Sequence, residues 1–163
     1  MFTIYISSYE VPIITADGSH MSVRNVSVCE ANGLVDLRDW EPPLELDNME
    51  VVLVKRWGAE KLRLPHNVKR AILHFLRHHH TRQDISFDCY AFANLVKGIE
   101  FHKVPYMFQY WDTKPKLWSV KIGSIVFLVS GKNQFHHAAV CIGRGLYLSV
   151  WGAGGDLEVA TLK

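Results

Sequence analysis

The sequence lacks several features that would place a protein in a special class. No apolar run reaches the roughly 18 residues that a membrane-spanning helix needs. The opening stretch, MFTIYISSYEVPIIT, has no basic region and contains polar residues and a proline, so it is unlike a cleaved signal peptide. The 3 cysteines are an odd number, which argues against a disulfide framework. We therefore expect a cytoplasmic protein, or one exported without a cleaved signal peptide.

Charge of one sign is also scarce. The formal net charge is only +2 at pH 7, which does not favour nucleic acid or an anionic membrane as the main partner. Without a long apolar run we also expect no stable membrane insertion. In contrast, 48% of the residues are hydrophobic, enough for a sizeable core. The length of 163 residues suits one domain, so we expect residues 1–163 to form a single domain.

The first part of the chain is rich in predicted strands. FTIYI and VPIIT are typical of two short strands broken at Ser7-Ser8, and SVRNVSV alternates polar and apolar residues. VVLVKRW and KLRLP are expected to form a hairpin around residues 58–60.

Two helices and three strands are predicted after this part. Apolar residues over 67–80 follow helical spacing, with Asn67 as the cap. A second helix is expected over about 86–97, ending at Gly98. SIVFLVS, HAAVCIG and LYLSVWG then have the composition of strands, so we predict an α+β fold with an antiparallel sheet.

The stretch FDCYAFANLVKG leaves two interpretations of Cys89 open. Cys89 shares a helical face with Phe92, and free cysteine is among the most buried residue types. Alternatively, if Ser86 or Asp88 is the N-cap, Cys89 lies in the first turn, where the helix dipole stabilises a thiolate. A nucleophilic cysteine also needs a base, which is usually histidine.

His137 is the candidate base. It starts the run HAAVCIG, from which its side chain can project from a sheet edge toward the start of the helix. The alternative is that His136 and His137 are two loop histidines before a strand.

Three short motifs together resemble those of one enzyme family. DCYAFANLV resembles a D-C-x-x-[FL] helix start, and KIGSIVFLVS, residues 121–130, resembles a "pGDlvff" strand. HAAVCIGRGLYLS resembles an H-V-G-I-Y-I-G-x-G-x-x-I-H block, with Gly143 and Gly145 in register. These motifs are those of the NlpC/P60 branch of the papain-like cysteine peptidases, and the resemblance covers about residues 84–162.

The resemblance implies a papain-like core over residues 83–163, with 1–82 as an extension of strands and one helix. In such a core a helix carrying Cys89 packs on an antiparallel sheet carrying His137. Cys89 would attack a carbonyl carbon, and His137 would take the thiol proton and later pass it to the leaving amine. The Cys89 backbone N–H would hold the oxyanion, and no cofactor or metal is needed.

The sequence departs from the family at several positions. The place of the third polar residue, often histidine, is taken by Ser149, which would orient the imidazole without adding a charge. Tyr90 and Ala91 replace the serine and glycine that many members carry after the cysteine. Ser124 replaces the aspartate before the strand.

The resulting expectation is a thiol hydrolase acting on amide bonds of a peptide or protein. It would be a peptidase or amidase of cell-wall peptides, or a glutamine deamidase, and a secreted bacterial toxin or effector suits the missing signal peptide. Acyl transfer is a second alternative, and a catalytically inactive papain-like module that binds a protein partner is a third. An active site requires a partly exposed Cys89 with its sulfur about 3.5–4 Å from a ring nitrogen of His137.

Other candidate sites have simpler explanations. Consecutive histidines at 78–80 point about 100° apart on a helix, so we expect no metal site there. Cys29 and Cys141 have apolar neighbours and are expected in the core. Trp151 can line a cleft or pack in a core, and the GAGG stretch after it is expected to be a turn.

Overall fold

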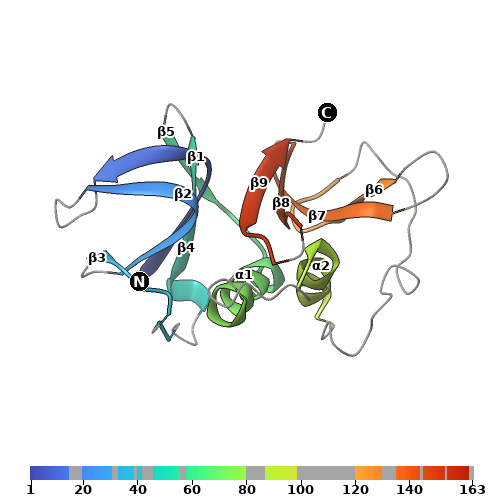
Figure 1. The fold of residues 1–163 in the computed structure, drawn as a ribbon, viewed down its shortest axis with the longest axis horizontal. Helices are drawn as coiled ribbons and strands as arrows, with labels where there is room; N and C mark the ends of the chain where they lie inside the picture. Colours follow the sequence, from blue (N-terminus) through green and yellow to red (C-terminus); the bar gives the residue numbers. More distant parts are fainter. Residues whose placement is uncertain are drawn as a thin grey trace.

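The computed structural model of the chain combines α-helices with two β-sheets (Figure 1), so the predicted α+β class is confirmed. It describes residues 1–14, 20–30, 33–38, 40–41, 46–55, 58–79, 87–98, 120–129, 135–143, 145–152 and 154–161. Within these residues, no helix is both long enough and apolar enough to cross a membrane.

The first part of the chain forms a five-stranded sheet in the order β3-β2-β1-β4-β5. Its strands are β1 (Phe2–Ile14), β2 (His20–Glu30), β3 (Gly33–Leu34), β4 (Met49–Lys55) and β5 (Gly58–Leu62), and the 3-10 helix η1 (Leu46–Asn48) precedes β4. The predicted break at Ser7-Ser8 was wrong, because β1 continues through it with a register shift between Ser7 and Val11. The predicted hairpin of β4 and β5 is confirmed, but residues 58–60, which were expected in its turn, all lie in β5.

Two helices follow, α1 (His66–His78) and α2 (Cys89–Lys97). The prediction that Asn67 caps α1 was wrong, because Pro65 occupies the cap position. The Asn67 amide instead donates to the carbonyl oxygen of Val96 at 3.1 Å, which joins the two helices. Gly98 ends α2 as predicted, with a φ of 79° that favours glycine.

The last part of the chain forms a four-stranded antiparallel sheet in the order β6-β7-β8-β9. Its strands are β6 (Ile125–Val129), β7 (Phe135–Gly143), β8 (Leu146–Val150) and β9 (Leu157–Thr161). The first three are the predicted strands, whereas β9 was not predicted.

One hydrophobic core extends through both sheets and both helices. It includes Ile4 of β1, Phe75 of α1, Phe92 of α2 and Leu148 of β8, each at most 1% exposed. Figure 1 shows the two sheets side by side, with α1 and α2 along one side of them. The core therefore holds α2 against the sheet that carries His137, which positions the two candidate residues.

Candidate functional site

Cys89 is the first residue of α2, and its position follows from the cap before it. Asp88 is the N-cap, with extended backbone angles and a side chain that accepts a hydrogen bond from the Ala91 N–H at 2.9 Å. The predicted first-turn position of Cys89 is therefore confirmed, with Asp88 as the capping residue.

The Cys89 thiol is buried, with the residue only 7% exposed, so the expected partial exposure is not present. Burial raises the pKa of the Cys89 thiol above its ordinary value of 9.0, because a thiolate loses its hydration there. The backbone N–H of Ala138 lowers the pKa of the thiol and so opposes this rise most strongly. The backbone N–H groups of Tyr90 and of Cys89 itself also lower it. The thiol is consequently neutral at pH 7 and is surrounded by N–H groups that favour negative charge.

His137 lies near the start of β7 and is also buried, at 8% exposed. The indole ring of Trp151 stacks on its imidazole, with ring centroids 4.1 Å apart and an interplanar angle of 21°. Burial lowers the pKa of His137 below its ordinary value of 6.5, and the Asp88 carboxylate partly offsets this. Its Nε2 atom is buried and has no hydrogen-bond partner among the residues that the structure describes.

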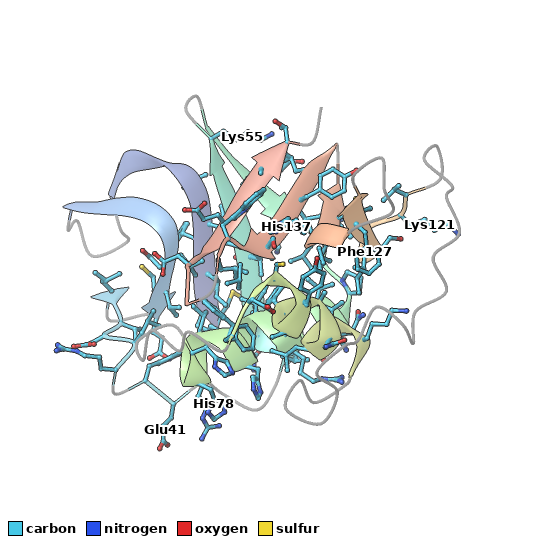
Figure 2. All side chains as sticks on the ribbon, turned by 45° about the vertical axis from the view of Figure 1, so that its right-hand side comes forward. Glu41, Lys55, His78, Lys121, Phe127 and His137 are labelled. Atoms are coloured by element: carbon cyan, nitrogen blue, oxygen red, sulfur yellow. The ribbon has the colours of Figure 1, made fainter. Side chains whose placement is uncertain are left out.

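The start of α2 and the start of β7 meet at this point. The Ala138 N–H faces the Cys89 sulfur, which puts the thiol against the residue that follows His137. The Asp88 charge acts on both Cys89 and His137, as expected for groups that lie close together. No hydrogen bond joins the thiol to the Nε2 atom within the described ranges. Figure 2 shows His137 on the C-terminal sheet, above α2 in that view.

A β-bulge lies directly at His137. Leu128 of β6 pairs with His137, whereas the next residue, Val129, pairs with Phe135. β7 therefore has one unmatched residue between Phe135 and His137. Bulges bend a strand and redirect its side chains, and they are frequent beside active sites. The sequence contains no glycine or proline there that would have revealed the bulge.

Ser149 lies on β8, the strand next to β7, and its hydroxyl has a backbone partner on β7. The hydroxyl donates to the carbonyl oxygen of Ala138 at 2.7 Å, in a position that is fully buried. The proton of Ser149 therefore satisfies a backbone acceptor of β7, whereas the acceptor role toward the imidazole that the family resemblance implied stays a prediction.

The turn after β8 connects the two halves of the site. Trp151 covers His137, and three residues later the Gly154 N–H donates to the carbonyl oxygen of Phe87 at 2.9 Å, just before Asp88. Gly152 and Gly154 thus lie in a turn, as predicted for this stretch, and the turn contacts His137 through Trp151 and the residue before Asp88 through Gly154. The sequence left open whether Trp151 lines a cleft or packs in a core, and the structure places its ring on His137.

The remaining candidates do not join this site. Cys141 is buried on β7 as expected, whereas Cys29 on β2 is only half-buried, and neither forms a disulfide. His74, His78 and His79 have neighbouring rings at the end of α1, but no His, Cys, Asp or Glu cluster suited to a metal occurs in the described part of the chain.

The Asp88 cap can be separated from the Asp88 charge by two substitutions. Asp88→Ala should lower the free energy of unfolding by about 1 kcal/mol, because the Ala91 N–H loses its acceptor. Asp88→Asn should cost much less, since asparagine caps as well as aspartate. Both variants should lower the pKa of His137 further, because both remove the carboxylate that raises it. Urea unfolding measures the first effect, and NMR titration of the imidazole measures the second; equal stability loss in both variants would contradict the cap.

No protein-family model, curated protein or solved structure that was compared with this chain matches it. The function of the site is therefore inferred from its geometry and from the motifs in the sequence.

Proposed function

We propose that this protein is a thiol hydrolase of amide bonds, with Cys89 as the nucleophile and His137 as the base. The observation that carries this proposal is the buried Nε2 of His137, which lacks a partner among the described residues, beside a cysteine at the start of a helix. A buried ring nitrogen without a hydrogen bond costs about 1–3 kcal/mol, and a catalytic role is one reason for a protein to retain such a group. A helix that carries cysteine and packs on an antiparallel sheet that carries histidine is the papain-like arrangement.

The pKa directions favour a neutral resting pair over a thiolate–imidazolium pair. Burial raises the pKa of Cys89 and lowers that of His137, so both side chains are uncharged at pH 7. The neutral imidazole then acts as a general base, taking the thiol proton as the sulfur attacks the carbonyl carbon.

The products follow from the usual two steps. The attack forms a tetrahedral oxyanion, for which the N–H groups at the start of α2 are available. The imidazolium gives its proton to the leaving nitrogen, which departs as an amine, or as ammonia when the substrate is a glutamine side chain. The acyl group stays bound to Cys89 as a thioester. Water then hydrolyses the thioester to a carboxylic acid. Cell-wall peptides and protein glutamines both provide such amides, and a secreted toxin or effector is the setting we propose.

Alkylation of Cys89 by iodoacetamide as a function of pH tests the proposed pair. If neutral His137 assists the thiol, the rate should rise through a first step below pH 6.5, reach a plateau, and rise again above pH 9.0 as the thiol ionises. His137→Ala should remove the lower step and leave the upper one. Mass spectrometry of the peptide that contains Cys89 measures both.

Cys141 provides an internal control for this experiment, because it is a buried cysteine on the same strand as His137. Its alkylation should be unchanged in His137→Ala. A profile for Cys89 with only the upper step, in the presence of His137, would overturn the general-base assignment.

A second candidate function is an inactive papain-like module that binds a protein partner. The observation in its favour is the burial of Cys89 at 7% exposure, together with a Ser149 hydroxyl that donates to the backbone. In that case Cys89 is a core residue, and Cys89→Ala or Cys89→Ser leaves binding of the protein partner unchanged.

A further inference from the structure

A groove on the protein lies away from the cysteine and histidine. It is a groove of about 820 Å³, bordered by β5 and the residue after it, by residues 120–122, and by the turn between β7 and β8. His137 is near the start of β7, whereas Ile142 and Gly143, which line the groove, are at its end. Figure 2 shows Lys121, at the groove, well apart from His137. This groove is therefore separate from the candidate active site.

The open edge of the five-stranded sheet borders the groove. β5 is the last strand of that sheet, and Lys61, Leu62 and Arg63 line the groove one after the other. Side chains alternate between the two faces of a strand, so consecutive residues border one hollow only when it lies along the strand edge. Lys61 and Leu62 pair with β4, and among the described residues the backbones of these two and of Arg63 make no other backbone hydrogen bond. Such an edge can accept another strand.

The groove combines positive charge with apolar surface. Arg63 and Lys121 are exposed and have no ion-pair partner in the part of the chain that the structure describes. The other two charged residues of the lining are already paired, Lys61 with Glu50 and Glu60 with Lys55. Ile122 is a large hydrophobic residue that is 44% exposed, and buried Ile142 lies in the same lining. A partner with carboxylates and apolar side chains complements both properties.

We propose that this groove binds an extended segment of a protein partner in which acidic and apolar residues alternate. The segment pairs with the edge of β5 through its backbone, which is a common mode of peptide recognition. Its carboxylates face Arg63 and Lys121, and its apolar side chains contact Ile122. Alternation suits this site because a strand presents its two sets of side chains to opposite sides. The proposal is independent of hydrolysis at Cys89.

Fluorescence anisotropy with a labelled peptide in which valine alternates with glutamate tests this proposal. The peptide should bind the intact protein, and raised salt should weaken binding. The variant Arg63→Glu with Lys121→Glu should bind at least about tenfold more weakly, because two attractive contacts become repulsive. The same variant should gain binding to a matched peptide in which lysine replaces glutamate. Both positions are exposed, so thermal unfolding should be nearly unchanged.

Two further probes distinguish strand pairing from simple charge attraction. The valine–glutamate peptide with alternate backbone amides N-methylated keeps every charge but loses one edge of hydrogen-bond donors, and it should bind much more weakly. Equal binding of the methylated peptide overturns the strand-pairing proposal. Binding that ignores the two charge reversals, or tighter binding of a single-stranded oligonucleotide than of the acidic peptide, overturns the choice of partner.

Discussion

Replacing Cys89 by alanine should reduce hydrolysis of a substrate amide by about ten-thousand-fold or more, because the thioester cannot form without the sulfur. The assay follows release of ammonia or amine from cell-wall peptides and from glutamine-bearing proteins by mass spectrometry. His137→Ala should cause a loss of similar size, and the double variant should be little worse than either single one, since the two side chains act as a unit.

Cys141→Ala is the matched control for Cys89→Ala. Both cysteines are buried and free, but Cys141 lies toward the other end of β7 from His137. The control should keep activity and lose only the modest stability of a shortened buried side chain. Hydrolysis that survives in Cys89→Ala, or that disappears equally in Cys141→Ala, would contradict the assigned nucleophile.

The second large effect is on stability, at the contact between the two helices. Phe75 of α1 is 1% exposed, and its ring centroid lies 5.6 Å from that of Phe87 and 6.4 Å from that of Phe92. Phe75→Ala should therefore lower the free energy of unfolding by about 3–5 kcal/mol, as expected for a buried phenylalanine truncated to alanine. Urea unfolding followed by circular dichroism measures this change.

Truncation of an exposed residue provides the comparison. Leu34 on β3 is 60% exposed, so Leu34→Ala should change the free energy of unfolding by no more than about 0.5 kcal/mol. Equal effects of Phe75→Ala and Leu34→Ala would mean that the helices do not share a core with the sheets. Because Phe87 directly precedes Asp88, Phe75→Ala should also increase the alkylation of Cys89 by loosening the start of α2.

The sequence predicted most elements correctly, because their signals are local. The apolar spacing over 67–80 predicts α1 to within a few residues, and glycine at position 98 predicts the end of α2. The errors occurred where distant contacts override local preference. The Ser7-Ser8 pair was expected to end a strand, but β1 pairs with β2 both before and after the register shift between Ser7 and Val11, so the strand continues to Ile14.

The candidate site was predictable in part for the same reason. Asp88 is a capping residue directly before Cys89, so the position of the thiol in the first turn could be derived from the sequence. The bulge at His137 and the stacking of Trp151 depend on the pairing of β7 with β6 and on the turn after β8. Neither has a signal in the residues concerned.

By itself, the sequence determined the α+β class, the start of α2 at a capped cysteine and the strand that carries His137. Composition, periodicity and capping act over a few residues, so they are present in the chain before it folds. Only the tertiary structure decided that Cys89 and His137 are both buried, and that the Ser149 proton goes to Ala138. Burial sets the directions of both pKa shifts, because it depends on how α2 and the two sheets share one core.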